Sequence, residues 1–376
     1  MKTLSYMRNK ALTAAVLLVA ATASAQQADN TFSVMTLNVD GLPAKIAFFD
    51  VNKDGPASAG SERISEYIAS KDCDIVAMQE DFNYRWEIWS RLFADYNHDE
   101  WSGGIMTEDQ PAIDYAHLHH TKFTCDGLNM SWKKAGKSDA YERVAWQRSF
   151  GKFSHDFDDI ITKGFRRHEM TLANGLELVV YNMHMDASSD RDEKAGNDGK
   201  DREARQTQWE QLRDYILSHL DKRPVIVMGD MNSYYHRDPV QSVFIEAIEK
   251  TGLASVGDAW VDIQHGGAFP VFGGEPTEGE TLDKVIYINP NDTPTPITPK
   301  RVILDTTDYL NGGKPLGDHY PLIVTFAYDG LSTGINGVST AQDESQDTPA
   351  YSLQGIILPQ GDQHGVVIQQ HRKFIK

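Results

Sequence analysis

Val225-Ile-Val-Met-Gly-Asp-Met-Asn-Ser233 is the segment that decides the fold. Its first four residues are apolar and mostly β-branched, which predicts a short strand, and polar Asp230 and Asn232 follow where that strand should end. A strand that is apolar at every position must be covered on both faces, as in layered α/β proteins. Taken alone, Asp230 after a glycine also fits a helix cap. The role of Asp230 therefore depends on what the rest of the chain shows.

Similar apolar runs recur along the chain. We expect strands over residues 31–37, 74–78, 176–181, 285–288 and 321–326. Helical patterns fall between them: residues 61–69 and 202–220 carry apolar side chains at the spacing of an amphipathic surface helix. Nearly continuous apolar strands interleaved with such helices predict the α/β class.

Polar residues lie next to these runs, at the positions where an α/β sheet presents its ligands. Singly, each has a structural alternative, because an asparagine can be a turn residue and a Glu-Asp pair can lie in a solvated loop. Together, in this order, they predict one pocket built from several strand ends. The set is Asn38, Glu80, His184, Asp230, Asn232, Asp283, Asp318 and His319.

Six ordered motifs resemble those of the endonuclease/exonuclease/phosphatase superfamily. They are Thr36-Leu-Asn-Val-Asp-Gly41, Ile75-Val-Ala-Met-Gln-Glu80, Tyr181-Asn-Met-His-Met-Asp186, Gly229-Asp-Met-Asn-Ser233, Leu282-Asp-Lys-Val-Ile286 and Gly317-Asp-His-Tyr-Pro-Leu322. The resemblance covers residues 32–326 and implies a four-layer αββα sandwich, DNase I-like, in which two packed β-sheets are flanked by helices. It also implies a divalent-metal-dependent phosphoesterase, and it leaves the substrate open.

The expected metal is Mg²⁺, with Mn²⁺ or another divalent cation as alternatives. A carboxylate, waters and substrate phosphate usually hold Mg²⁺, so we expect Glu80 to be its direct ligand. The resemblance places Asn38 beside Glu80, as a ligand of the metal or of the phosphate. Asp318 is either a second metal ligand or a structural partner. The metal would neutralise the phosphoryl oxygens and the leaving oxygen.

Catalytic roles follow from side-chain chemistry and from the resemblance. His319 is expected to be the general base that takes a proton from water, because imidazole titrates near neutral pH. Asp283 would orient His319, as in a hydrolytic triad. The resemblance makes His184 and Asn232 hydrogen-bond donors to the phosphate oxygens, and Asp230 would align the water or the leaving group.

The N-terminus predicts a secretory signal peptide over residues 1–25. Three cations, Lys2, Arg8 and Lys10, precede the apolar run 11–21, and the sequence closes at Ala23-Ser-Ala25. That run is too short for the ~20 residues of a membrane helix, so we expect a secreted, periplasmic or cell-surface protein without a transmembrane segment. Losing three positive charges would take the formal charge from −18 to −21. Such acidity repels polyanions and disfavours nucleic acid as a partner.

The composition divides the chain into a catalytic domain (26–328), a Gly-, Ser-, Thr- and Asp-rich linker (329–348) and a small β module (349–376). The module resembles the short C-terminal module of exported Bacteroidota proteins, although Ile356 stands where an arginine is common. Cys73 and Cys125 either form a disulfide or stay free thiols. We expect a monomer.

Two features favour the bacterial sphingomyelinase-like branch of the superfamily. Lys163-Gly-Phe165 and Asp318-His-Tyr-Pro321 are similar to segments of those enzymes. The preferred hypothesis is therefore a phosphodiesterase that acts on a phospholipid headgroup at a membrane surface. A secreted nuclease or an inositol- or sugar-phosphate phosphatase is the alternative, and a non-catalytic binding protein on this scaffold is a third.

The sequence shows little apolar surface for contact with lipid. Cytolytic members of that branch carry an aromatic, membrane-dipping hairpin before the final Asp-His pair, whereas residues 303–317 offer only Tyr309 and Leu310. Residues 268–272 form another apolar stretch, either an alternative tip for contact with lipid or a loop packed on the core, and we expect the packed loop. His236 and Asp238, after the fourth motif, are interpreted as a solvated turn.

Overall fold

The computed structural model describes residues 30–46, 49–50, 52–99, 126–151, 161–188 and 196–330, together with four short strands near the C-terminus. Thr31–Gly330 forms one compact unit. The predicted signal peptide, almost all of the predicted linker and Cys125 lie outside the described residues. Cys73 is buried and forms no disulfide with any described residue, so a disulfide to Cys125 and free thiols both stay predictions. No helix among the described residues is long and apolar enough to cross a membrane.

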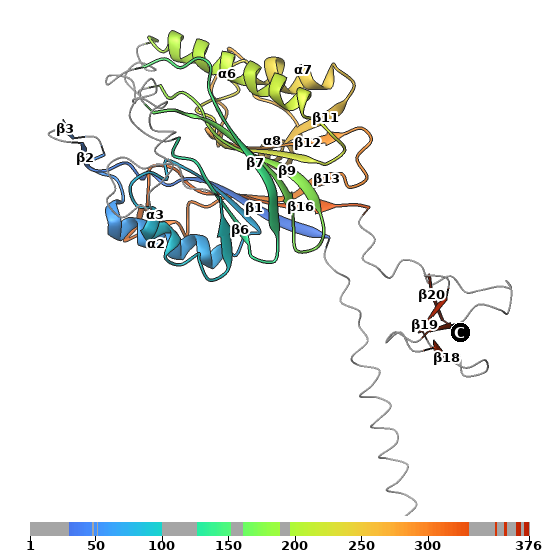
Figure 1. Cartoon of the computed structure of the whole chain (residues 1–376). Coiled ribbons are helices and arrows are strands. Elements are labelled where there is room, and N and C mark those ends of the chain that lie inside the picture. Colours follow the sequence, from blue (N-terminus) through green and yellow to red (C-terminus); the bar gives the residue numbers. More distant parts are fainter. Residues whose placement is uncertain are drawn as a thin grey trace, which may run out of the picture. The chain divides into compact units, whose positions relative to one another are not determined.

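Two six-stranded sheets form the centre of this unit (Figure 1). The first sheet has the order β13 (Ile297–Leu304), β16 (Leu322–Tyr328), β1 (Thr31–Asn38), β4 (Ile75–Gln79), β6 (Asn129–Lys133) and β5 (Tyr96–His98). The second has the order β11 (Ala254–Asp258), β12 (Asp283–Pro290), β10 (Val225–Asp230), β9 (Glu177–His184), β8 (Gly164–Thr171) and β7 (Lys137–Ala145). Each sheet contains one parallel pair, β1 with β4 and β9 with β10, at its centre.

Helices cover the outer faces of both sheets. Helices α2 (Ala57–Lys71) and α3 (Arg85–Trp89) lie against the first sheet, and α6 (Gly199–Ser218) and α7 (Glu246–Glu249) lie against the second (Figure 1). A π-helical turn, η1 (Gln241–Ile245), leads into α7, and α8 (Ala259–His265) connects β11 to the loop before β12. The predicted α/β class and the four-layer αββα sandwich are confirmed.

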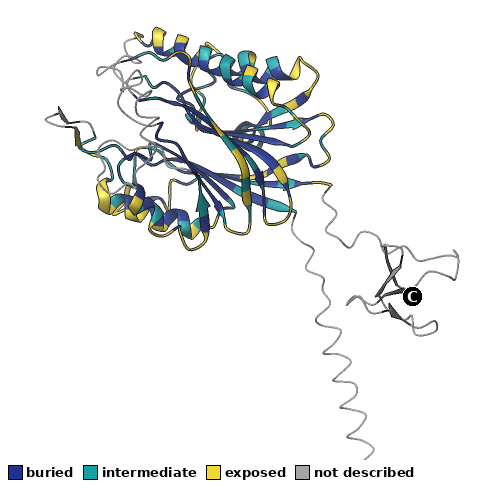
Figure 2. Cartoon of the chain, in the orientation of Figure 1, coloured by how far each residue is buried: buried dark blue, intermediate teal, exposed yellow. Residues whose placement is uncertain are grey.

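The strands that were apolar at every position are buried at every position. All residues of β4 and β10 are buried, which fits central strands packed on both faces (Figure 2). On α2 the apolar stripe Ile64, Tyr67 and Ile68 packs on the first sheet. Sequence periodicity did not predict β7 or β8, since both are rich in charged residues.

Smaller strands pair with one another outside the two six-stranded sheets. In the main unit, β2 (Lys45–Ile46) pairs with β3 (Phe49–Asp50), and β14 (Leu310–Asn311) pairs with β15 (Lys314–Pro315). The second unit contains β17 (Ala350–Tyr351), β18 (Ile357–Leu358), β19 (Val366–Gln369) and β20 (Arg372–Ile375), in the order β18-β17-β19-β20. The resemblance of this segment to a Bacteroidota module stays a prediction, as do the domain boundaries.

Gly229 allows β10 to lie close to β9 just before the polar strand end. Its φ is 150°, and a Cβ here would meet the carbonyl oxygen of Met183 at 2.1 Å. We expect Gly229→Ala to lower the free energy of unfolding by about 3 kcal/mol, measured by urea denaturation. Gly199→Ala is the control, because a Cβ at Gly199 in α6 meets nothing within 4 Å. Equal stability of the two variants would contradict this explanation.

Candidate active site

The polar residues predicted from the motifs converge where the central strands of the two sheets end. In the first sheet, Asn38 at the end of β1 lies opposite Gln79 at the end of β4, and Glu80 follows. In the second sheet, Asp230 at the end of β10 lies between His184 of β9 and Asp283 of β12. Five of the six motifs, far apart in the sequence, therefore supply one site, and His319 of the sixth joins it at Asp230.

Asn38 joins the two sheets at this site. Its Nδ2 donates to Glu80 Oε1 at 2.9 Å and to Asp230 Oδ2 at 3.1 Å. Its Oδ1 accepts from the backbone N–H of Asp40 at 2.9 Å. The amide as placed therefore presents a donor to the carboxylates, and Asn38 would offer its oxygen to a cation only after rotation. Its predicted role as a metal or phosphate ligand stays a prediction.

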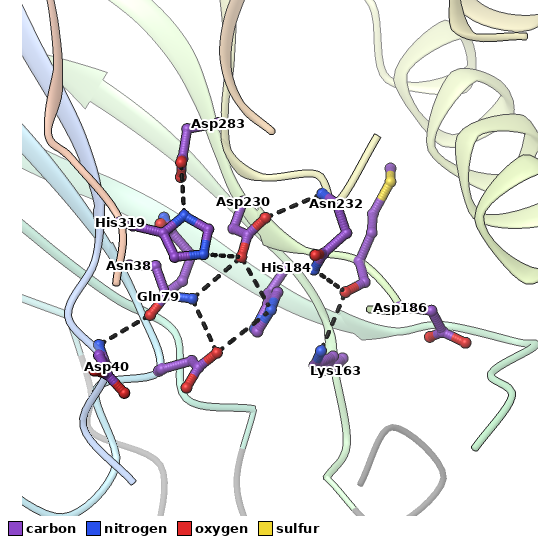
Figure 3. A network of polar contacts seen from close by, with 12 residues as sticks. Asn38, Asp40, Gln79, Lys163, His184, Asp186, Asp230, Asn232, Asp283 and His319 are labelled. Carbon is purple, nitrogen blue, oxygen red and sulfur yellow. Dashed lines mark hydrogen bonds and ion pairs between the residues drawn. The ribbon is translucent and has the colours of Figure 1, made fainter. Parts of the chain in front are cut away.

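His319 lies between two carboxylates (Figure 3). Its Nδ1 is 2.7 Å from Asp283 Oδ2, and its Nε2 is 3.5 Å from Asp230 Oδ2. Burial disfavours the charged ring, but Asp283 and Asp230 outweigh it and raise the pKa of His319 well above 6.5. Burial alone would raise the pKa of Asp230, yet the nearby His319, His184 and Lys163 lower it to about 2. Without a bound cation, these charges favour an ionised Asp230 beside a protonated His319.

His184 is the second imidazole of the site. Its Nε2 lies 3.4 Å from Asp230 Oδ2 and 3.9 Å from Glu80 Oε1. Burial, together with the charge of Lys163, lowers the pKa of His184 well below 6.5. The ring is therefore neutral at pH 7, and its Nδ1 has no hydrogen-bond partner among the described residues. A neutral imidazole can donate a hydrogen bond to an oxygen without adding charge to the site.

Asn232 turns back toward the site through an unusual backbone conformation. Its φ is 46°, its N–H donates to Asp230 Oδ1 at 3.0 Å, and its Nδ2 donates to the carbonyl of Met185 at 3.0 Å. Asp40 and Glu80 also have positive φ, 51° and 53°. Left-handed conformations are unfavourable for residues other than glycine, and they cluster where a structure holds functional side chains in place.

Negative charge accumulates around Glu80. Burial, followed by the charge of Asp318, raises the pKa of Glu80 to about 7. The pKa of Asp40 is also raised to about 7, by burial and then by Asp318 and Glu80. Carboxyl groups that crowd together in a partly buried site favour either protons or a cation. The oxygen-rich donor set therefore fits a hard divalent metal.

Two compact groups of side chains have ligand atoms close enough to share one ion. They are Glu80, His184 and Asp230, and Asp230, Asp283 and His319, each with ligand atoms within 4.8 Å of one another. Asp318 belongs to neither group and is exposed. It acts on Glu80 and Asp40 through its charge, and its predicted role as a metal ligand stays a prediction.

The raised pKa of Glu80 makes the effect of a metal depend on pH. The folded protein holds this proton up to about pH 7, whereas the unfolded chain loses it near 4.5. Without a cation, stability should therefore fall as the pH rises from about 4.5 to about 7. Protons also compete with the metal for Glu80. We expect excess Mg²⁺ to raise the Tm more at about pH 8 than at about pH 6 in thermal melts; the opposite order would contradict this.

Polar side chains beneath the site hold the two sheets in register. Gln79 Nε2 donates to Asn182 Oδ1 at 2.7 Å, and Asn182 Nδ2 donates to the carbonyls of Met78 and Asn129 at 3.0 and 2.8 Å. Both side chains are fully buried. The motifs Gln79-Glu80 and Asn182-Met-His184 contain these residues, but only the structure shows that they bond to each other across the sheets.

Lys163 was not among the predicted site residues. It is buried, and its Nζ donates to the carbonyl of Met185 at 3.2 Å. Its charge lowers the pKa of both Glu80 and His184. The Lys163-Gly pair was a sequence signal for it, yet the sequence alone did not place this cation beside the site.

The residues after Asn232 form the predicted turn, which also supplies part of the wall of a pocket, but Asp238 in this turn is buried and not solvated. Asp238 is buried and bonds to Arg205 at 3.2 Å. His236 Nδ1 lies 2.8 Å from Glu280 Oε2. The pocket measures about 590 Å³ and is lined by Gly196, Asp198, Arg202, Tyr234, His236, Arg237, Pro276, Thr277 and Glu280.

Sphingomyelinases are among the curated proteins that this chain resembles. Those of Mycobacterium tuberculosis and Mycobacterium bovis are 31% identical to it over 218 residues, which is 54% of this chain and 37% of each relative. The chain thus spans little more than a third of the length of these relatives.

Solved structures share the fold at low sequence identity. D. rerio TDP2, humanized by 14 mutations, has a TM-score of 0.52 at 17% identity, covering 79% of this chain and 99% of that chain. A variant of beta toxin from Staphylococcus aureus with bound magnesium ions has a TM-score of 0.50 at 14% identity, covering 78% and 98%. Both likenesses concern the fold alone.

The family model agrees with the motifs and the site. The sequence model of the Endonuclease/Exonuclease/phosphatase family matches residues 35–287, which is more than half of the chain. This range includes Asn38, Glu80, His184, Asp230 and Asp283. The chain belongs to the endonuclease/exonuclease/phosphatase family.

Proposed function

We propose that this phosphoesterase is a secreted, divalent-metal-dependent phosphodiesterase that hydrolyses a phospholipid headgroup, with sphingomyelin as the leading candidate. The observation that carries the proposal is the meeting of two elements at Asp230. A Glu80 carboxylate suited to a hard cation lies on one side, and the His319–Asp283 pair lies on the other. The similarity to mycobacterial sphingomyelinases supports the choice of lipid.

Glu80 and Asp230 would hold the metal, and Mg²⁺ is the expected ion, because both supply oxygen atoms from a crowded, partly buried site. The beta toxin variant with this fold carries magnesium ions. A bound cation would neutralise charge on the phosphoryl and leaving oxygens. Asn38 remains a candidate ligand of the metal or of the phosphate, and Asp318 a candidate second metal ligand or structural partner.

The remaining side chains would act on protons and on the phosphate oxygens. His319 would accept a proton from the attacking water or return one to the leaving oxygen, and Asp283 would keep its Nε2 directed at the site. Since Asp283 and Asp230 keep His319 protonated, acceptance of a proton requires that this negative charge be compensated. His184 and Asn232 would donate hydrogen bonds to the phosphate.

The test is a substrate panel. Purified protein with Mg²⁺ is assayed against sphingomyelin, phosphatidylcholine, plasmid DNA and inositol phosphates, with EDTA and Glu80→Ala as controls. Release of phosphocholine from sphingomyelin that needs both Mg²⁺ and Glu80 would support the proposal. Hydrolysis of DNA or of inositol phosphates alone would replace it with the nuclease or phosphatase alternative. Inactivity on the whole panel would favour a non-catalytic binding protein.

A further inference from the structure

The loop between α8 and β12 exposes two adjacent apolar side chains. Val271 is 73% exposed and Phe272 is 53% exposed, whereas Phe269 stacks edge-on against Tyr235 and Pro270 is buried. The expectation that residues 268–272 pack on the core is therefore correct for Phe269 and Pro270 and wrong for Val271 and Phe272. We call Val271 and Phe272 the apolar tip.

The loop holds the apolar tip in a defined conformation. Gly273, with φ of 76°, donates its N–H to the carbonyl of His236 at 2.7 Å. Gly274 donates to the carbonyl of Val271 at 2.8 Å, which closes a turn around the tip. Phe269 and Pro270 anchor the other side. The exposure of Val271 and Phe272 is thus a feature of an anchored loop.

A short series of contacts joins the apolar tip to the active site. His236, which binds Gly273, also binds Glu280, three residues before the site residue Asp283. The next residue, Arg237, donates to the carbonyl of Asn232 at 2.5 Å. His236, Arg237 and Glu280 line the polar pocket of about 590 Å³. Through His236 and Arg237, the apolar tip and the polar pocket are thus both joined to the active site.

We propose that the apolar tip inserts into the surface of a bilayer of zwitterionic phospholipid and so holds the pocket and the active site against lipid headgroups. The inference rests on the proposed function, which requires access to a lipid. The apolar tip also offers an apolar surface that the loop before Asp318 does not. In the β14–β15 hairpin region before Asp318, Tyr309 is buried against Tyr67, and Leu310 is only partly exposed.

Charge around the tip selects the class of bilayer. Glu275 and Glu278, in the same loop, are exposed, and the whole chain has a formal charge of −18. An anionic membrane surface attracts basic segments and repels acidic ones. Zwitterionic lipids such as phosphatidylcholine and sphingomyelin avoid this repulsion, whereas phosphatidylserine should weaken binding.

The experiment measures binding to sedimented vesicles of phosphatidylcholine and sphingomyelin. It uses the full chain carrying Glu80→Gln, so that hydrolysis does not alter the vesicles. Adding Val271→Ser and Phe272→Ser should weaken binding roughly ten-fold or more, because both apolar side chains that the tip inserts into the lipid are then lost. The matched control is Leu253→Ser, since Leu253 is also 53% exposed but lies at β11, away from the loop.

Three outcomes would overturn the inference. They are unchanged binding in the tip variant, an equal loss with Leu253→Ser, and a wild-type dimer in light scattering that the tip substitutions convert to monomer, which would make a second copy the occupant. Hydrolysis by the active enzyme is a separate readout. Tip-dependent binding without sphingomyelin cleavage would reject the proposed substrate and keep the membrane contact, whereas cleavage with tip-independent binding would reject the tip alone.

Discussion

Replacement of His319 by alanine is expected to lower kcat by roughly 10²- to 10⁴-fold on the substrate identified in the panel. The ring bridges Asp283 at 2.7 Å and Asp230 at 3.5 Å, and alanine removes the group between these carboxylates. Water in its place would neither hold a proton at the same point nor balance the two charges. The measurement is steady-state kinetics with saturating Mg²⁺.

Two controls separate chemistry from folding in the His319→Ala variant. Loss of the ring leaves Asp283 and Asp230 buried without their cationic partner, which should destabilise the fold by about 3 kcal/mol. Circular dichroism and urea denaturation would show whether the variant is still folded at the assay temperature. His219→Ala, at an exposed position after α6, should leave activity unchanged and cost only about 1 kcal/mol of stability, from the loss of its contacts with Tyr215. Retention of activity within ten-fold of the wild type by a folded His319→Ala variant would remove His319 from the mechanism.

Glu80→Gln should reduce activity by roughly 10²- to 10³-fold and abolish the Mg²⁺-dependent rise in Tm. Glutamine keeps the shape of the side chain and an oxygen that can accept the hydrogen bond from Asn38 Nδ2. It removes the charge that a divalent cation needs. Because burial and Asp318 already raise the pKa of Glu80 to about 7, loss of that charge should leave the metal-free protein as stable as the wild type or more stable.

The matched control for Glu80→Gln is Glu62→Gln, since Glu62 is exposed on α2. This control should keep full activity and the full Mg²⁺ effect in the same thermal melts. An unchanged Mg²⁺-dependent shift in the Glu80→Gln variant would show that the metal binds elsewhere. Lower stability of the metal-free variant would show instead that the Glu80 carboxylate is stabilised in the fold.

Local sequence determined the central strands and the list of candidate site residues. Continuous apolar runs such as 225–228 predicted buried strands correctly, because a strand covered on both faces has no polar alternation to disguise it. The polar residues at their ends could be named for the same reason: Glu80 and Asp230 stand where such strands must stop. The sequence motifs therefore identified the family and the candidate residues of the site.

Only the tertiary structure decided how charges far apart in the sequence compensate one another. Strand β8 contains a fully buried Arg166, which a local pattern predicts to be exposed; its guanidinium pairs with Asp99 at 2.7 Å and with Asp126 at 3.0 Å. Lys163 beside the active site and the Gln79–Asn182 bond across the sheets are likewise contacts between groups far apart in the sequence.

The apolar tip is a case in which local sequence did not predict that apolar residues would be exposed. Residues 268–272 are all apolar, yet Pro270 is buried and Val271 is exposed. Local periodicity records which residues of a regular element face the core. It does not record which distant groups will neutralise a buried charge or cover a loop, because those partners are brought together by the packing of the two sheets.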